Sequence, residues 1–195
     1  ALPAMPPPAR QKNPPRFSHN PTRHPSFPFF IRLPFGRNFF FAHSLAGFRG
    51  AWRRYDHRGK TARGVDVYDD YAHHPTAIRE TLRALRAKTS GRVIVAFHPH
   101  LYSRTRDLLD GFARSFEDAD RVLIAPIYAA RETDDGTVSS ELLASRIRDE
   151  GGNAEAVNSL EQLETLLEAE GESGDVIMTM GAGDIYKVAD AIVGK

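Results

Sequence analysis

The stretch VDVYDDYAHHPTAIRETLRALRAK, residues 65–88, decides the fold. Its opening VDVYD is a short apolar run rich in β-branched residues, which is typical of a buried strand. Pro75 then suits the first position of a helix. Apolar residues follow at the spacing of one helical face, namely Ile78, Leu82 and Leu85. The stretch therefore predicts a strand, a polar loop and a helix over residues 75–88.

The same alternation continues to the end of the chain. Further strand-like runs are RVIVAF (92–97), RVLIAPI (121–127), a weaker AEAV (154–157) and DVIMTM (175–180). Helical spacing covers residues 105–116 (with Leu108, Leu109 and Phe112 inward), 140–150, 160–170 and 185–193. Alternating strands and helices predict a doubly wound α/β fold, with a mostly parallel sheet covered by helices on both faces. Ligands of such sheets bind beyond the carboxyl ends of the strands, so the loops there are the expected site.

Composition excludes several classes of protein. The chain has 195 residues, 41% of them hydrophobic and 26% charged, which is enough for one sizeable core. No apolar run approaches the roughly 20 residues that a membrane span needs. Cysteine is absent, which excludes disulfides, cysteine-ligated zinc and a cysteine nucleophile. This composition fits a reducing cytoplasm.

The amino-terminal part differs from the rest. Residues 1–42 are rich in Pro, Arg, His and Phe, and they show no helical or strand period. Nine basic residues precede the first acid, Asp56, so the net charge of +1 conceals a basic start and an acidic remainder. A transit peptide or a nucleic-acid-binding arm is an alternative, but the many prolines disfavour an amphipathic helix. We expect residues 1–42 to be an irregular leader outside the fold and residues 43–195 to be the folded domain.

Two polar loops follow the first two predicted strands. The first, DDYAHHPT at 69–76, places two acids, a tyrosine and two histidines at a helix start, which favours a bound anion. Its alternative reading is that Asp69, Asp70 and Thr76 cap the helix while the histidines are solvated. The second loop, HPHLYSRTR at 98–106, places Arg104 and Arg106 near a helix start, where cations are unfavourable unless an anion compensates them. It predicts a carboxylate or phosphate site, or else a solvated basic turn.

These motifs, taken in order, resemble the Mur ligase family. DDYAHHPT is followed by PHLYSRT, and the likeness also includes FRGAWRRYDHRG (48–59), ADRVLIAPIYAARE (119–132) and MTMGAGDI (178–185). The resemblance covers residues from about 45 to the end. It implies the Rossmann-like, amino-acid-accepting C-terminal domain of a ligase that builds peptidoglycan precursors in the bacterial cytoplasm.

The resemblance also implies a reaction and its partners. Family members use ATP and Mg²⁺ to convert a carboxylate, here that of UDP-N-acetylmuramate, into an acyl phosphate that the amino group of L-alanine attacks. The sequence has no GxxxxGK[ST] phosphate loop and no GxGxxG turn. The family's metal ligands come mainly from its central domain, so we expect no metal ligands here and no turnover by this chain alone. Neither a nucleic acid nor a membrane is an expected partner.

Site residues carry over position by position. Asp70 matches the acid that hydrogen-bonds the ATP ribose, and Arg54 matches the arginine that reaches the ATP phosphates. Tyr71, His73 and Arg104 match positions around the incoming L-alanine. Arg104 is expected to hold its carboxylate, and His73 to orient its amine or accept a proton.

The second loop departs from the family pattern. Leu101 stands where many members have arginine, so His100 or Arg106 is expected to supply the second contact to the acceptor, unless Arg104 suffices. His98 stands where glutamine is usual and has no expected role. The glycine turn at 181–185 either packs or contacts a ligand. The alternatives to an alanine-adding enzyme are a murein tripeptide recycling ligase, which is not expected to carry PHLYSRT, and a non-catalytic α/β binding module.

Overall fold

The computed structural model describes residues 51–193, so the predicted leader and the first residues of the predicted domain lie outside it. The strands are β1 (Asp56–Lys60), β2 (Asp66–Asp70), β3 (Val93–Phe97), β4 (Arg121–Ile124), β5 (Ala154–Ala156) and β6 (Val176–Met180). The helices are α2 (Pro75–Arg86), α3 (Tyr102–Asp107), α4 (Leu109–Ala113), α5 (Ser140–Asp149), α6 (Leu160–Glu170) and α7 (Tyr186–Ile192). No helix in residues 51–193 is long and apolar enough to cross a membrane.

The described strands form one sheet in the order β1-β2-β6-β3-β4-β5. All neighbours pair in parallel except β1 and β2, which are antiparallel. The last strand, β6, lies between β2 and β3, so the chain crosses the sheet to reach it. The predicted mostly parallel α/β sheet is confirmed.

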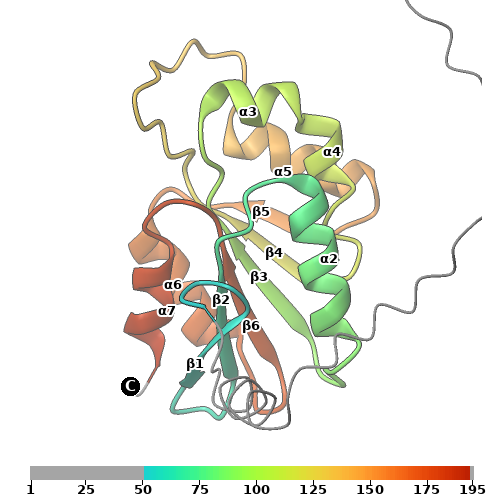
Figure 1. Ribbon diagram of the computed structural model, residues 1–195, viewed down its shortest axis with the longest axis vertical. Coiled ribbons are helices and arrows are strands. Elements are labelled where there is room, and N and C mark those ends of the chain that lie inside the picture. The colour runs from blue at the N-terminus through green and yellow to red at the C-terminus, as the bar shows by residue number, and fades with distance from the viewer. Residues whose placement is uncertain (1–50, 194–195) are drawn as a thin grey trace, which may run out of the picture. The chain divides into compact units, whose positions relative to one another are not determined.

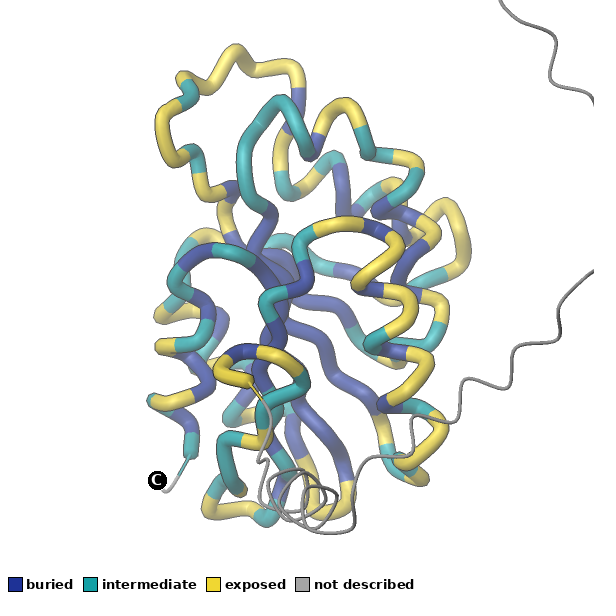
Figure 2. The backbone as a smooth tube through the Cα atoms, in the orientation of Figure 1, coloured by how far each residue is buried: buried dark blue, intermediate teal, exposed yellow. Residues whose placement is uncertain are grey.

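Helices cover both faces of the sheet (Figure 1). One core cluster joins α2, α4 and α5 to the sheet, with Ile78, Phe112 and Leu143 almost fully buried. The other joins α6 and α7 to the opposite face through residues such as Leu163 and Val188. As a result, the central strands are buried while the outer surfaces of the helices are exposed (Figure 2). This two-sided burial explains why β3 is apolar throughout and β6 is apolar at every position but Thr179.

Two features differ from the sequence-based expectations. Strand β1 was not predicted, because its sequence DHRGK has no apolar alternation; its backbone pairs with β2 at one edge of the sheet. The single helix expected over residues 105–116 is instead two short helices, α3 and α4, separated at Leu108. Phe112 is buried as expected, whereas Leu108 and Leu109 are only partly buried against the core.

Candidate functional site

The polar loops meet at one edge of the sheet, beyond the carboxyl ends of its parallel strands. Met180 of β6 is in register with Asp70 of β2 on one side and with Phe97 of β3 on the other. Phe97 is in turn in register with Ile124 of β4. The segments that leave these strands therefore begin side by side, and those after β2 and β3 lead into α2 and α3 (Figure 1). This is where the fold predicts a ligand site.

The loop after β2 presents Tyr71 and His73, both partly exposed. Their rings meet edge to face with centroids 5.0 Å apart. The Nδ1 atom of His73 lies 2.8 Å from the carbonyl oxygen of Tyr71. A carbonyl only accepts, so Nδ1 carries a proton, and in that tautomer Nε2 is the acceptor nitrogen of the neutral ring. His74, not an aspartate, caps α2, through Nδ1 at 3.4 Å from the Thr76 amide.

The loop after β3 presents His100 and Arg104. Nη1 of Arg104 lies 3.4 Å from Nδ1 of His100, and the His100 ring stacks on Tyr128 with centroids 5.5 Å apart. Burial, and then the charge of Arg104, lower the pKa of His100, so its imidazole is neutral near pH 7 and Nδ1 can accept. The His73 and His100 rings are 6.4 Å apart, which joins the two loops.

The backbone at Leu101 is strained. Its φ is 71°, which lies in a backbone region that residues other than glycine rarely adopt. Hydrogen bonds fix both ends of this residue, because its amide donates to the Tyr128 carbonyl at 2.9 Å and its carbonyl accepts from the Thr105 hydroxyl at 2.8 Å. Such strain costs roughly 1–3 kcal/mol and persists only where the surroundings hold it. Leu101 immediately precedes α3, the helix that carries Arg104.

Two adjacent arginines precede β1 and have different environments. Arg53 is 3% exposed and donates to Asp69, Gly181 and Gly183, at 2.7, 2.6 and 3.0 Å. Arg54 is exposed, with its guanidinium carbon 5.0 Å from the centroid of the Tyr71 ring. Arg53 therefore stabilises the fold through buried hydrogen bonds, whereas Arg54 is exposed beside the first loop. The buried role of Arg53 was missed by the sequence analysis.

The two acids that end β2, Asp69 and Asp70, have different hydrogen-bond partners. Asp69 is fully buried and accepts from Arg53 and from the Thr179 hydroxyl at 2.6 Å. Asp70 is 7% exposed and accepts from the backbone amides of Tyr55 and Ala72, both at 2.7 Å. Burial raises the pKa of Asp70 against these two hydrogen bonds. Neither acid caps α2, so the capping alternative is wrong for both.

The glycine turn after β6 is packed against His98. The main chain at Gly181 has a φ of 142°, and a Cβ there would lie 2.5 Å from the His98 carbonyl oxygen. His98 is 6% exposed, and within residues 51–193 its Nδ1 has no hydrogen-bond partner. Burial is the main cause that lowers the pKa of His98 to about 4. The turn therefore has a packing role around a neutral histidine.

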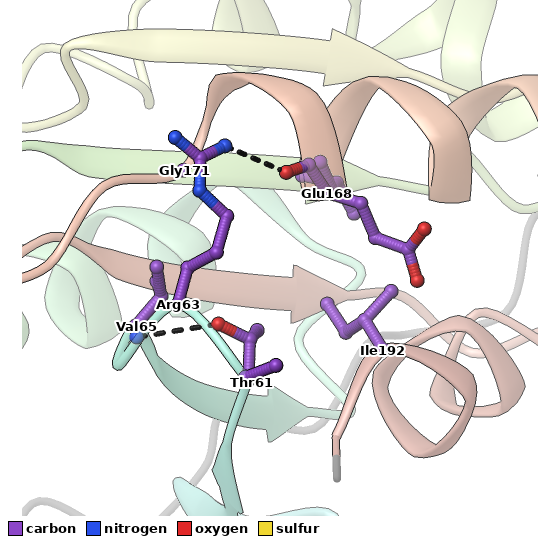
Figure 3. A pocket seen from close by; sticks show the side chains of 8 residues that line it. Thr61, Arg63, Val65, Glu168, Gly171 and Ile192 are labelled. Carbon is purple, nitrogen blue, oxygen red and sulfur yellow. Dashed lines mark hydrogen bonds between the residues drawn. The ribbon is translucent and has the colours of Figure 1, made fainter. Parts of the chain in front are cut away.

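A cavity of about 230 Å³ lies away from these loops, and Figure 3 shows its lining. It is bordered by Val65, just before β2, and by Ile192, the last residue of α7. Arg63 crosses its edge and donates to the carbonyls of Glu168 and Ala169, at 2.9 and 2.8 Å. Because these residues lie toward the amino end of β2, this cavity is distinct from the loop site. No cluster of metal-ligating side chains occurs in the described part of the chain.

Comparison with known proteins identifies the family. A sequence model described as "Mur ligase, glutamate ligase domain" matches residues 53–183. The chain belongs to the Mur ligase family. That match contains the loops after β2 and β3 and the first residues, 181–183, of the glycine turn.

Known Mur ligases show how much of such an enzyme this chain represents. It is 47% identical over 146 residues to the UDP-N-acetylmuramate–L-alanine ligase of Clostridium novyi, covering 75% of this chain and 32% of that protein. It is 48% identical over 152 residues to the ligase of the same name from Desulfitobacterium hafniense, covering 77% and 34%. The chain thus spans about a third of the length of the curated relatives it matches.

A solved Mur ligase has the same fold. The crystal structure of UDP-N-acetylmuramate–alanine ligase from Thermotoga maritima aligns with a TM-score of 0.61 and 26% identity, covering 77% of this chain and 31% of that one. The expected Mur ligase C-terminal fold is therefore confirmed for the described residues.

Proposed function

We propose that this chain is the acceptor domain of an ATP-dependent UDP-N-acetylmuramate–L-alanine ligase of the bacterial cytoplasm. The observation that carries the proposal is the continuous row Arg54, Tyr71, His73, His100 and Arg104 at the carboxyl edge of the sheet. Its cations are separated by aromatic and imidazole rings. The relatives named above carry this activity in their names and support the assignment.

The acceptor is L-alanine, which presents a carboxylate and an amine. Arg104 binds the carboxylate, because its guanidinium is partly exposed and a neutral His100 beside it adds no competing charge. Tyr71, whose ring meets that of His73 edge to face, lies beside the bound amino acid. Nε2 of His73 faces the amine, since Nδ1 is occupied by the Tyr71 carbonyl. His73 thus orients the amine or accepts its proton as the amide bond forms.

ATP, with Mg²⁺, supplies the phosphoryl group that activates the muramate carboxylate. Arg54 is exposed and fits a phosphate contact. Each Asp70 oxygen already accepts one amide, so a ribose hydroxyl would use a remaining lone pair. The described residues contain no cluster for the metal, which would be held by the rest of the enzyme. On this proposal the chain alone does not turn over.

A chimera tests the proposal. The segment of the C. novyi ligase that matches this chain is replaced by residues 48–195, and phosphate release is measured with and without L-alanine. We expect alanine-dependent release, and none from the 195-residue chain alone. Arg104→Ala should raise the KM for L-alanine about 10- to 100-fold, because a charge-assisted hydrogen bond to the carboxylate is lost.

Arg106→Ala is the matched control. Arg106 is two residues away but donates to Asp135 at 3.0 Å and Asp107 at 3.2 Å. The KM for L-alanine should stay within about twofold. An unchanged KM in Arg104→Ala, or phosphate release that is indifferent to alanine, refutes the acceptor assignment. Turnover with a preformed tripeptide in place of alanine would instead identify a recycling ligase.

A further inference from the structure

We propose that Glu132 is a positioning residue for the acceptor site, which acts by fixing the first turn of α3. The proposal rests on the proposed contact between Arg104 and the acceptor carboxylate. Glu132 lies in the connection between β4 and α5, outside the two loops discussed above. A backbone hydrogen bond of 2.9 Å from its amide to the Ala129 carbonyl closes the turn that brings it to α3.

Helix α3 lacks a capping group of its own. Its N-cap residue is Leu101, whose side chain has no polar atom and cannot accept from the first free amides of the helix. Glu132 supplies that acceptor from a different segment. Its Oε2 accepts from the Ser103 amide at 2.9 Å, and its Oε1 accepts from the Ser103 hydroxyl. These bonds lower the pKa of Glu132, which keeps it ionised.

The capped turn is the one that carries the acceptor-binding arginine. Arg104 directly follows Ser103, and Leu101 before them is held at its strained φ of 71°. If the Ser103 amide lost its acceptor, the turn would keep the two hydrogen bonds at Leu101 but lose the one that holds the residue next to Arg104, and Arg104 would sample other directions. Glu132 also acts electrostatically on His100. The carboxylate is therefore placed to order both groups without touching the acceptor.

A second contact ties the same connection to α3. Asp135 accepts from Nη1 of Arg106 at 3.0 Å, but both side chains are exposed, so this pair contributes little to holding α3. Tyr128, at the start of the connection, donates its amide to the Pro99 carbonyl at 2.8 Å and stacks on His100. The segment 128–135 thus contacts the second loop before, within and after the strained residue.

The test uses the full 195-residue chain in solution NMR, with L-alanine as the probe. Glu132→Ala should weaken L-alanine binding about fivefold, which corresponds to the loss of one helix cap. It should also shift the Arg104 Nε signal and speed exchange of the Ser103 amide. Glu132→Gln keeps one acceptor and should restore part of the affinity. Asp134→Ala is the matched control, since Asp134 accepts from Gly136 within its own loop, and it should change affinity less than twofold.

A double variant separates positioning from general destabilisation. In an Arg104→Ala background, Glu132→Ala should cause no further loss of alanine affinity, because its effect passes through Arg104. Equal losses in both backgrounds, or an unchanged Arg104 Nε signal and Ser103 exchange in Glu132→Ala, overturn the proposal. If Arg104→Ala alone leaves alanine binding intact, the proposed function of Arg104 fails. The Nε signal and the Ser103 exchange then decide the role of Glu132 independently.

Discussion

Replacing Arg53 by methionine should be among the most destabilising single changes in residues 51–193. The guanidinium is 3% exposed and makes hydrogen bonds to Asp69 and to two carbonyls of the glycine turn. Methionine fills similar space but leaves the fully buried Asp69 carboxylate with the Thr179 hydroxyl as its one side-chain partner within residues 51–193. Removing one partner of a buried ion pair costs about 3–5 kcal/mol of unfolding free energy. For an m-value of about 2 kcal/mol/M, the urea midpoint should fall by about 1.5–2.5 M.

Urea unfolding followed by far-UV circular dichroism measures this effect, with Arg54→Met as the matched control. Arg54 is exposed beside the Tyr71 ring, so its replacement should cost less than about 0.5 kcal/mol. Adding Asp69→Asn to Arg53→Met should recover about 1–2 kcal/mol, because the uncompensated charge is removed while an acceptor for Thr179 remains. Equal midpoints for the two arginine variants would refute the buried ion pair. A double variant no more stable than Arg53→Met would show that the isolated charge is not the cause.

Three further changes test the packing of the fold. The folded pKa of His98, about 4, lies below its unfolded value of about 6.5, so the unfolded chain binds more protons between these pH values. The free energy of unfolding should therefore fall by about 3 kcal/mol as the pH is lowered from 6.5 to 4. In His98→Gln, this part of the pH dependence of the urea midpoint should be absent. Gly181→Ala places a Cβ 2.5 Å from a backbone oxygen and should lower the free energy of unfolding by more than about 2 kcal/mol. Gly136 has a φ of 72° but open space around it, so Gly136→Ala should cost about 1 kcal/mol. Equal shifts in the thermal midpoint of the two variants would contradict the steric explanation. Leu163→Ala should cost about 2–5 kcal/mol in calorimetry, and a loss no larger than that of the partly buried Leu166→Ala would argue against the α6 core.

The sequence predicted the α/β architecture because burial on both sheet faces leaves a strong apolar pattern. The predicted helix over residues 160–170 coincides with α6, and the runs that become β3 and β6 are apolar at nearly every position. Strand β1 left no such signal. It is stabilised by backbone pairing at a sheet edge, for which the charged side chains of DHRGK give no evidence. The break between α3 and α4 likewise depends on tertiary packing around Leu108.

The candidate site was predictable in outline but not in its details. The motifs placed Tyr71, His73, His100 and Arg104 in neighbouring loops, and the structure brings them into one row. Adjacent residues of one type could not be distinguished in the same way. Which arginine of the pair 53 and 54 faces inward depends on positive φ angles at Arg53 and Tyr55. Glu132 was invisible because its partner lies 29 residues away in sequence.

The first described residues, in the turn before β1, lie beside the candidate site. The Tyr71 amide donates to the Arg53 carbonyl at 2.8 Å, and the Tyr55 amide donates to Asp70 at 2.7 Å. These hydrogen bonds therefore hold the turn before β1 and the loop after β2 together. If the domain swings as a body, Arg54 and Tyr71 travel together at constant spacing. On the proposed function, such a movement would bring the proposed phosphate contact, Arg54, and the proposed acceptor-site residue, Tyr71, to the reaction centre together.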